Sequence, residues 1–563
     1  MFRRMKVMRT ILFYFIFSCS CLYCQTPYLF KKDYDKKSSA AFMQKSNIIK
    51  LPNKGYAVCF ENKTDTATPD TTKLTIVTFE PNGNPNWGLE IPLYYAYNGT
   101  PISLYLATDN TILLSYTIYT NTSDTINYNW YGDVVIFKID LNGNLIWSKT
   151  YGNKFGDDIC RNIFGNSNHI YICGNTYDTL YTSNAFLTEI DLNGNIIFSK
   201  NYTFPNVTTN SGVLNWGFVD YGAINNSNDI LLTSNIQTWK YQYFYNLNSS
   251  GNINWTKRMQ TSGDGGFGSE LHFIKPLNDG SFLICGREDT ITNGQWDIWL
   301  SKISSTGNLI FSKALGGTTW DEALWVEENY KNEIILLCEP ESYLGGISQT
   351  AVYKFGTNGN LIWGNIYNSS NASYPFGATK NNEDSTYTIF GVNGSYDEVE
   401  EIFLLKIDDD GNAPCNYQPA TFPILDFGVL ENIIVTESPS FRSSDTTLIA
   451  SPISVNSNLI CDMGTYIEPT DTNKPCKLNY FIPNVFSPNS DNLNNLYKIE
   501  VDCYESYFIS IYNRWGQKLF TSSSPEISWN GRTTSGKEVP EGTYYYIINI
   551  DDKVEKGFLT LLK

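Results

Sequence analysis

The stretch Lys138-Ile-Asp-Leu-Asn-Gly-Asn-Leu-Ile-Trp-Ser-Lys149 decides the fold of most of this chain. Two apolar arms meet at Asn142-Gly143, a dipeptide that tolerates the positive φ angles of a tight hairpin turn. The stretch therefore predicts a β-hairpin.

The same hairpin recurs seven times along the chain. Its turn glycines are Gly83, Gly143, Gly194, Gly251, Gly307, Gly359 and Gly411. They are spaced by roughly 55 residues, a period that is typical of propeller blades rather than of helical solenoids. Four residues after these glycines stand Trp87, Trp147, Phe198, Trp255, Phe311, Trp363 and, breaking the series, Cys415. We expect these aromatic rings to pack between neighbouring units, although an aromatic series is also what a sugar-stacking platform would need.

Each unit also carries an apolar run ahead of its hairpin. The runs are 55–60, 111–116, 169–174, 229–234, 281–286, 333–338 and 385–391. They are short, rich in β-branched and aromatic residues, and flanked by Gly, Asn or Asp, which indicates buried strands. With a weaker strand before each run, as at 157–164 and 321–327, every unit has four strands. Residues 38–415 are therefore predicted to form a closed seven-bladed β-propeller. The segment from Ala314 to Ala323 resembles uncharacterised propeller repeats of exported bacterial proteins.

Composition agrees with an all-β protein. Aromatic residues make up 15% of the 563 residues and charged residues only 17%, and no sustained helical periodicity is present. The formal net charge of −17 and the absence of a basic track argue against nucleic acid as a partner.

The chain begins with a predicted signal peptide, residues 1–24. Four basic residues precede the apolar segment 11–17, which is too short to span a membrane, so no membrane span is expected in the mature chain. The pattern leaves open simple cleavage or lipidation at Cys19 or Cys21. In either case the mature protein leaves the cytoplasm.

Nine cysteines follow this leader. Cys59, Cys173, Cys285 and Cys338 occupy the same place in the apolar runs of four units, and Cys160 matches Ala323 of another unit, so all five are expected in the core. The remaining four, Cys415, Cys461, Cys476 and Cys503, form an even set in an exported chain and predict two disulfides. The pairs expected are Cys415 with Cys461 and Cys476 with Cys503, one of three possible connectivities.

Few residues suggest chemistry. The acidic pairs Asp157-Asp158 and Asp321-Glu322 would suit acid and base catalysis on a sugar, but they recur at matching places and are expected to face solvent or cap turns. His169 and His272 are the only histidines and are expected to be structural. Asp140 begins a calcium-like spacing that lacks the distal Glu. We therefore expect no catalytic site, no metal site and no cofactor.

Two segments separate the repeats from the C-terminus. Residues 416–463 contain apolar runs that predict a β bridge, either an addition to the last blade or a small separate sheet, and residues 464–475 form a polar linker. Residues 476–563 show six short strands with turn residues between them, the pattern of a compact antiparallel β-sandwich of the Ig-like kind.

Four motifs lie on this last domain. They are PNVFSPN (483–489), IYNRWG (511–516), WNG (529–531) and PEGTYYY (540–546). Together, and in this order, they resemble the gliding motility-associated C-terminal domain, the type B sorting domain of the type IX secretion system. The family pattern around the first motif differs here, because Ser490, Asn492 and Asn495 replace two glycines and an acid, and this weakens the case for an ion at that loop.

The resemblance implies recognition by the type IX translocon in the outer membrane after the signal peptide has brought the chain into the periplasm. The residues that match the sorting motifs are Phe486, Pro488, Asn489, Asp491, Asn513, Arg514, Trp515, Gly516, Trp529, Gly531, Pro540, Gly542, Thr543 and Tyr544. We expect Arg514 and Trp515 to stack and Gly542 to allow a tight entry into the last long strand. Sequence alone does not separate receptor contacts from residues that determine the fold.

The sequence thus predicts a secreted or surface-exposed protein whose propeller is a binding or adhesion platform for a glycan or protein ligand. The alternatives are a polysaccharide-acting enzyme with its site in the propeller channel and a purely structural surface component.

Overall fold

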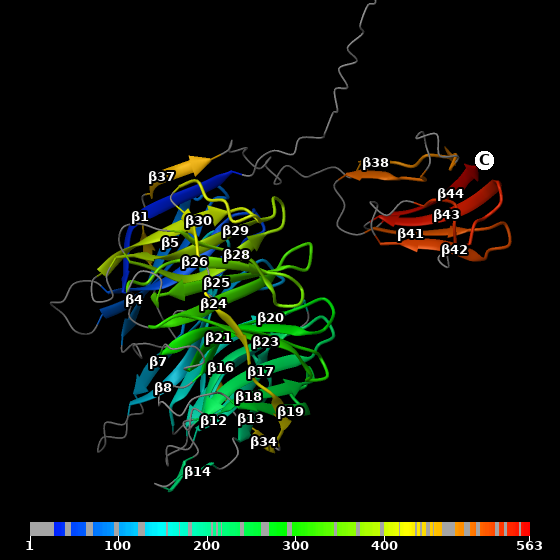
Figure 1. Cartoon of the computed structure of the whole chain (residues 1–563). Coiled ribbons are helices and arrows are strands. Elements are labelled where there is room, and N and C mark those ends of the chain that lie inside the picture. Colours follow the sequence, from blue (N-terminus) through cyan, green and yellow to red (C-terminus); the bar gives the residue numbers. More distant parts are fainter. Residues whose placement is uncertain are drawn as a thin grey trace, which may run out of the picture. The chain divides into compact units, whose positions relative to one another are not determined.

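The computed structural model describes residues 28–39, 47–63, 71–94, 101–121, 130–153, 156–167, 169–177, 183–203, 207–209, 212–214, 217–236, 241–260, 269–289, 295–342, 346–367, 372–394, 399–415, 417–420, 422–433, 436–439, 442–445, 451–453, 455, 457–463, 479–488, 496–502, 507–523, 529–533, 537–550 and 553–562. Regular structure in this part consists of β-strands, which confirms the all-β prediction. The chain divides into two compact units, Met1–Ile467 and Glu468–Lys563 (Figure 1).

The first unit contains seven five-stranded antiparallel sheets, which we number in chain order. Sheet 1 holds β2 (Ile48–Lys50), β3 (Tyr56–Lys63), β4 (Thr71–Phe79) and β5 (Pro85–Tyr94). Sheet 2 holds β6 (Ser103–Leu106), β7 (Ile112–Asn121), β8 (Trp130–Ile139) and β9 (Leu145–Gly152). Sheet 3 holds β10 (Asp158–Gly165), β11 (Ile170–Tyr177), β12 (Ser183–Ile190) and β13 (Ile196–Thr203). Sheet 4 holds β16 (Gly217–Ile224), β17 (Ile230–Ile236), β18 (Tyr241–Leu247) and β19 (Ile253–Gln260).

The other three sheets continue the series. Sheet 5 holds β20 (Glu270–Pro276), β21 (Phe282–Asp289), β22 (Trp296–Ile303) and β23 (Leu309–Leu315). Sheet 6 holds β24 (Asp321–Glu328), β25 (Ile334–Pro340), β26 (Ala351–Phe355) and β27 (Leu361–Tyr367). Sheet 7 holds β28 (Ser373–Asn381), β29 (Thr386–Asn393) and β30 (Val399–Ile407). A separate small hairpin joins β14 (Val207–Thr209) to β15 (Gly212–Leu214).

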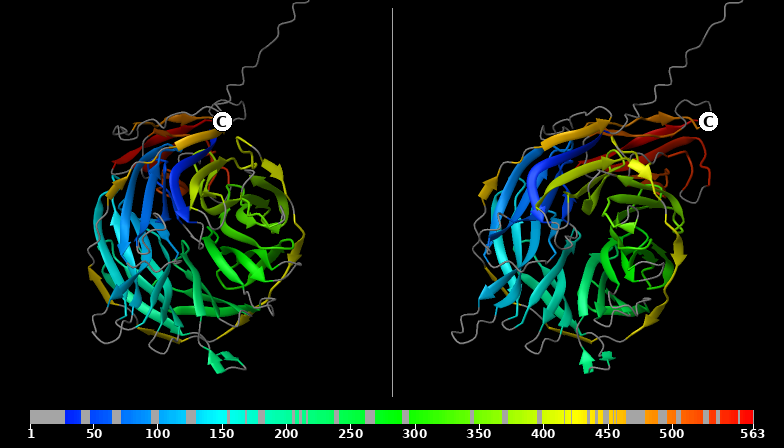
Figure 2. Two further views of the ribbon diagram at one scale, coloured as in Figure 1. Left: turned by 90° about the vertical axis from the view of Figure 1, so that its left-hand side faces the viewer. Right: turned by 60° about the vertical axis from the view of Figure 1, so that its left-hand side comes forward.

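Apolar layers between successive sheets form the core of this unit. Seven buried clusters each join two neighbouring sheets, from sheets 1 and 2 through to sheets 6 and 7, and the last joins sheet 7 back to sheet 1. Figure 2 shows the sheets placed around a common centre. The fold is propeller-like, because no single sheet could bury both of its faces without its two neighbours.

The aromatic residue in each hairpin contacts the turn glycine of the next unit, as expected from their constant spacing. Trp87 Nε1 donates to the carbonyl of Leu141 at 2.8 Å, and a side chain on Gly143 would collide with the Trp87 ring. Trp255 makes the same hydrogen bond to Ser305 at 2.9 Å. The rings are therefore part of the packing between sheets.

Cys415 breaks this series because the fourth strand of sheet 7 comes from the other end of the chain. Strand β1 (Leu29–Ser39) lies in sheet 7 beside β30, and Phe30 covers Gly83 of sheet 1 as Trp87 covers Gly143. Tyr34 Oη donates to the Gly83 carbonyl at 2.7 Å. The predicted start of the repeats at residue 38 was therefore too late.

A repeated sequence motif supports this placement of β1. The Phe-x-Lys-x-Tyr spacing of residues 30–34 also occurs at 198–202 and, with Trp in first place, at 147–151. Tyr151 and Tyr202 bond to Gly194 and Gly251 as Tyr34 bonds to Gly83. The motif at residues 30–34 is therefore visible in the sequence, but it lies far along the chain from the other strands of sheet 7.

Seven strands that lie between residues 417 and 463 form a belt around the seven sheets. Its strands are β31 (Tyr417–Pro419), β32 (Ile424–Asp426), β33 (Leu430–Asn432), β34 (Thr436–Pro439), β35 (Arg442–Asp445), β36 (Ser451–Ile453) and β37 (Ser457–Met463). In this order they add an outermost fifth strand to sheets 6, 5, 4, 3, 2, 1 and 7 (Figure 2). The predicted β bridge is therefore neither a separate sheet nor an addition to the last blade alone.

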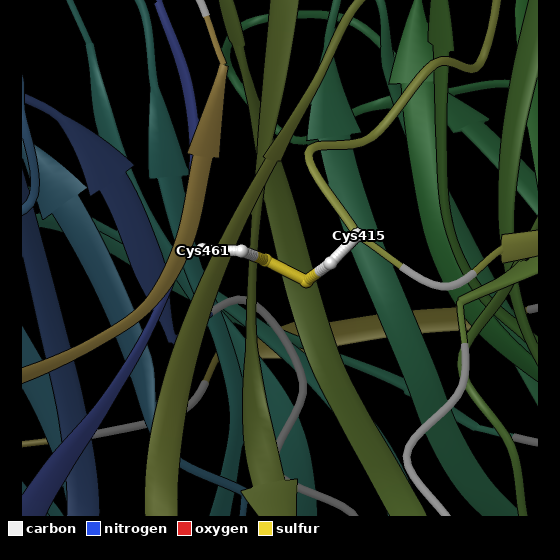
Figure 3. Close-up of a disulfide and its surroundings, with 2 residues drawn as sticks. All are labelled: Cys415 and Cys461. Atoms are coloured by element: carbon white, nitrogen blue, oxygen red, sulfur yellow. A yellow bond between two sulfur atoms is a disulfide. The ribbon is translucent and has the colours of Figure 1, made fainter.

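A disulfide joins the two ends of the belt. Cys415 precedes the first belt strand, Cys461 lies in β37, and their Cα atoms are 6.1 Å apart (Figure 3). Because the belt passes all seven sheets between these two cysteines, the bond closes a covalent loop around the unit. Cys476 and Cys503, the other expected pair, lie outside the described residues.

The hairpin turns differ from the predicted two-residue Asn-Gly turn. In 140–144 only Gly143 has a positive φ, 85°, and Asp140 Oδ1 accepts hydrogen bonds from the backbone of Asn142 and Asn144. The turn is thus a three-residue loop with a bulge, in which the Asp caps the backbone. These bonds account for Asp140 without calcium.

The five expected core cysteines are buried and take part in no disulfide. Cys59, Cys173 and Cys285 are the fourth residues of β3, β11 and β21. Cys338 is the fifth residue of β25 and pairs with Ala323, so it faces the preceding sheet; its predicted equivalence was wrong by one position.

The two faces of the ring differ in the length of their connections. On one, the short-turn face, strands are joined by tight turns such as 277–281 and 304–308. On the other, the long-loop face, connections such as those between β7 and β8 or β25 and β26 are longer. Connections of different lengths thus lie on the long-loop face.

The second unit has its own core. Its five-stranded sheet runs β39 (Val485–Phe486), β44 (Lys553–Leu561), β43 (Gly542–Ile550), β41 (Tyr507–Tyr512) and β42 (Lys518–Ser522). A two-stranded sheet pairs β38 (Asn479–Phe481) with β40 (Glu500–Asp502). β39 pairs parallel to β44, whereas an entirely antiparallel arrangement was expected.

Replacement of Phe30 by Ala should destabilise the first unit by about 3 to 5 kcal/mol, because the ring is fully buried where sheet 7 meets sheet 1. Chemical denaturation followed by tryptophan fluorescence measures this loss. Ile146→Ala, at a residue 51% exposed, is the control and should change stability by less than about 0.5 kcal/mol. Equal stability of the two variants would contradict the role assigned to β1.

Loss of the belt disulfide should also destabilise the first unit. A cross-link across 46 residues is worth about 4 kcal/mol through the entropy of the unfolded chain. Cys415→Ser and the double variant Cys415→Ser/Cys461→Ser should therefore show the same lowered unfolding midpoint. A double variant that unfolds like the oxidised wild type would show that the loop contributes nothing.

Candidate functional site

The IYNRWG motif forms a tight turn between β41 and β42. Asn513 Oδ1 accepts hydrogen bonds from the backbone N–H groups of Trp515 and Gln517, both at 3.0 Å. Gly516 has φ 76°, a conformation that favours glycine. The turn is fixed by its own backbone and the Asn side chain, so Arg514 and Trp515 are free to project outward.

Trp515 is 85% exposed, the most exposed large apolar side chain in the described part of the chain. No ring contact joins it to Arg514 among the described residues, so the expected stacking of these two side chains is wrong. Exposure of a whole indole on a rigid turn costs solvation without any benefit to folding. This is the strongest single sign of a contact surface in the second unit.

The PEGTYYY motif begins next to this turn. Tyr544 is buried, and its hydroxyl donates to the carbonyl of Pro540 at 2.5 Å, which folds the segment 540–544 back on itself. Gly542 has φ 144°, as expected for a tight entry into β43. Burial raises the pKa of Tyr544, and the nearby charge of Arg514 opposes this, so the two motifs lie close together.

Both motifs line one open groove with a volume of about 370 Å³. Its walls are Asn513, Arg514, Trp515, Leu519, Val539, Pro540, Glu541, Gly542, Thr543 and Tyr544. We call this the sorting groove. Leu519, Val539 and Glu541 were not among the expected site residues. Glu541 lies within the PEGTYYY motif, and Val539 directly precedes it.

Phe486, Trp529 and Gly531 of the sorting motifs belong to the core. Phe486 and Trp529 are each 1% exposed with ring centroids 5.4 Å apart, and Trp529 Nε1 donates to the Arg532 carbonyl at 2.6 Å. Gly531 has φ 74° and lies against Leu561, and Pro488 lies beside it. Asn489 and Asp491 are outside the described residues. The motifs therefore divide into residues that build the domain and residues that line its groove.

In the first unit, the two acidic pairs were expected at equivalent positions, but they are not equivalent. The strand registers align Asp158 with Asp321, so Asp157 matches Trp320 and the pairs are offset by one residue. Asp158 and Asp321 are fully buried rather than solvent-facing. Asp158 accepts the N–H of Asn153 at 2.5 Å, and Asp321 accepts those of Gly317 and Ser342, which confirms the turn-capping role.

The two histidines make contacts between structural elements. His169 Nδ1 lies 2.6 Å from Glu189 Oε1 and its ring stacks on Tyr171. His272 is fully buried, and its Nδ1 lies 2.9 Å from the Ala323 carbonyl of the next sheet. Each therefore has a packing role, as expected.

Within the described residues, no helix is long and apolar enough to cross a membrane, and no group of three or more His, Cys, Asp or Glu side chains could hold a metal ion.

Residues 480–561 match the family model of the CHU_C type IX secretion signal domain. The sorting groove and the core residues around Trp529 both lie within this match. The chain thus carries a type IX secretion signal at its C-terminal end, and such a signal directs a protein to the cell surface or to the outside of the cell.

No curated protein matches the chain significantly. The similar solved structures include the polysaccharide lyase Uly1, with a TM-score of 0.37 and 9% identity over 65% of this chain and 90% of that one. The NanB sialidase of Streptococcus pneumoniae has a TM-score of 0.39 and 10% identity over 67% of this chain and 70% of that one. PorZ of Porphyromonas gingivalis, a surface component of the type IX secretion system, has a TM-score of 0.27 and 8% identity over 94% and 100%.

The buried carboxylate Asp158 generates a pH prediction. Burial raises its pKa well above the usual value, with hydrogen bonds from Thr176 and Asn153 opposing and the charges of Asp133 and Asp157 assisting. A raised folded-state pKa means that wild-type stability falls as pH rises from about 4 through that pKa. Asp158→Asn removes this loss, so its stability relative to wild type should increase between pH 4.5 and pH 8, by about 1.4 kcal/mol for each pKa unit of the shift.

Asp140 is the control for this measurement, because its pKa is shifted in the opposite direction. Burial raises the pKa of Asp140, but hydrogen bonds from Asn144 and Asn142 bring it below the usual value. The stability of Asp140→Asn relative to wild type should therefore fall as pH rises through the acid range. Urea midpoints at several pH values measure both trends, and parallel curves for wild type and Asp158→Asn would contradict the assignment.

Proposed function

We propose that this protein is a type IX cargo whose first unit, a closed seven-bladed β-propeller, serves as a binding platform at the cell surface, and whose second unit, an Ig-like β-sandwich, is recognised by the translocon through the sorting groove. The observation that carries the first step is the type IX secretion signal at residues 480–561.

The sorting groove is the best supported contact for the translocon. Arg514, Trp515, Glu541 and Thr543 are exposed, and among the described residues no hydrogen bond or ring contact is made by the Trp515 side chain. Partner-binding energy is concentrated in exposed aromatic and Arg side chains of this kind when they lie beside a concave surface. The groove provides the concavity, and a hydrogen-bonded turn keeps Trp515 in place beside it.

The propeller-like unit supports a binding role through its construction. Its sheets are joined into a rigid ring by the belt and by β1, and its connections are long on one face only. A rigid scaffold that presents loops of variable length on one face is a common basis for ligand recognition. We propose that the protein does not catalyse a reaction and that the long-loop face holds the ligand.

An enzyme acting on polysaccharide is the second candidate. The observation in its favour is the pair Glu270 and Glu322 on the long-loop side of sheets 5 and 6, where two carboxylates flank one guanidinium, that of Arg287. Release of reducing ends from a polymer by the purified protein would favour this candidate over binding alone.

Export by the sorting groove predicts a graded loss of surface delivery. Removal of residues 468–563 should leave the protein in the periplasm, and Trp515→Ala in the full chain should reduce surface labelling at least about tenfold without lowering the thermal midpoint. Phe558→Ala, at an aromatic residue 58% exposed elsewhere on the same unit, is the matched control and should be delivered normally.

Two outcomes would contradict these assignments. Normal surface labelling of the truncated protein would refute export through the second unit. Normal delivery of Trp515→Ala, with the truncated protein retained, would leave the secretion signal in place and exclude the groove as its contact.

A further inference from the structure

An exposed tryptophan stands on the long-loop face between sheets 5 and 6. Trp320 is 41% exposed, and its backbone carbonyl accepts the N–H of Glu341 at 2.9 Å. The next residue, Asp321, caps Gly317 and Ser342 with its carboxylate, which ties the two loops on either side of Trp320 together. The indole is therefore an aromatic surface held in a fixed position, not a side chain on a loose loop.

A second tryptophan supports it from behind. The ring centroids of Trp296 and Trp320 are 5.0 Å apart, and Trp320 Nε1 donates to the side-chain oxygen of Gln295. The guanidinium carbon of Arg287 lies 3.6 Å from the Trp296 ring centroid. The guanidinium and the two indoles, whose planes are tilted by 41° to each other, form a row that leads from buried Arg287 to exposed Trp320.

Carboxylates lie around the guanidinium of Arg287, at the inner end of this row. Arg287 Nη2 is 2.7 Å from Glu270 Oε2, and Nη1 is 3.2 Å from Glu322 Oε2. Both carboxylates stay partly exposed, at 18% and 16%, so they can accept hydrogen bonds from a ligand as well as from Arg287. His272 Nε2 lies 3.8 Å from each of them and closes the inner side.

Arg287 reduces the negative charge of this cluster. The guanidinium offsets one of the two carboxylates that it bridges. Burial, and then the charge of Glu322, raise the pKa of Glu339 well above its usual value, and burial likewise raises the pKa of Glu341. An anionic ligand would be repelled by the carboxylates, and a cationic ligand would have to compete with Arg287 for them. The surface suits an uncharged molecule that combines a flat apolar face with hydroxyl donors.

We propose that this cluster is a subsite for a neutral polysaccharide, in which a sugar ring stacks on Trp320 and its hydroxyl groups donate to Glu322 and Gln295. Sugars have the required combination, because their C–H groups form an apolar face and their hydroxyls lie around its edge. The proposal rests on the binding role of the first unit and specifies the ligand class for it. The carboxylates of Glu270 and Glu322 bind and orient the sugar.

The test is a titration of the purified full-length protein with neutral hexasaccharides: cellohexaose, xylohexaose, mannohexaose and laminarihexaose. At least one should quench tryptophan fluorescence in a saturable way. Trp320→Ala should weaken that binding at least about tenfold, and Trp320→Phe, which keeps an aromatic face, should weaken it less than about threefold. Tyr330→Ala is the matched control, because Tyr330 is 64% exposed on the same sheet but at its short-turn end, and should leave binding unchanged.

The titrations distinguish a Trp320 subsite from its absence. Saturable binding that depends on Trp320 and not on Tyr330 supports the subsite. Absence of binding by all four sugars at millimolar concentration, or equal binding by wild type and both Trp320 variants, overturns it, as does preferential binding of a lysine-rich peptide. None of these results depends on secretion, whose own test is surface labelling of cells without any sugar.

Discussion

Closure of the ring is the constraint on which the first unit depends. Each sheet has two apolar faces, and each face is covered only by a neighbouring sheet, so an open row would leave two faces in water. The cluster around Phe30, Tyr56 and Phe390 removes those two faces, because it joins the last sheet to the first. Strand β1 makes the join strong, since the N-terminal end of the chain contributes backbone hydrogen bonds to the C-terminal sheet.

The belt addresses a second problem of this architecture. Without it, the fourth strand of every sheet would present an unpaired edge to solvent, and such edges invite pairing with other molecules. The belt covers all seven edges, and its own outward edge is made unattractive by short strands, by prolines such as Pro419 and Pro439, and by charges such as Asp426 and Glu431. Ion pairs from Lys313 and Arg258 hold the last two in place. An oxidising compartment then fixes the belt through its terminal disulfide.

The second unit shows how one set of motifs can serve two purposes. Phe486 and Trp529 fill the core, while Trp515 projects from a turn whose hydrogen bonds come from the backbone and the Asn513 side chain. The same word, PEGTYYY, supplies a core ring through Tyr544 and a groove wall through Glu541 and Thr543. A sequence motif alone cannot make this division, because burial depends on which strands pair and not on the identity of the residue.

The sequence by itself determined every feature that depends on local pattern. The hairpin at 138–149, the strands of each repeat, the step between aromatic ring and turn glycine, and the motifs of the secretion signal follow from residues a few positions apart, where turn chemistry and alternation decide the outcome. The resemblance of the last residues to a secretion domain was readable for the same reason.

Only the tertiary structure decided which distant segments meet. Strand β1 pairs with β30 of the last sheet across more than 300 residues, and the apolar runs of residues 416–463 predict strands but do not say which sheet each strand joins. Trp320 lies beside Trp296 and Arg287 because two neighbouring sheets bring their ends together. A one-residue offset, as at Cys338, also changes the face of the sheet on which a side chain lies, because neighbouring residues of a strand point to opposite faces. Long-range pairing and register depend on the packing of the whole ring, and no local pattern encodes them.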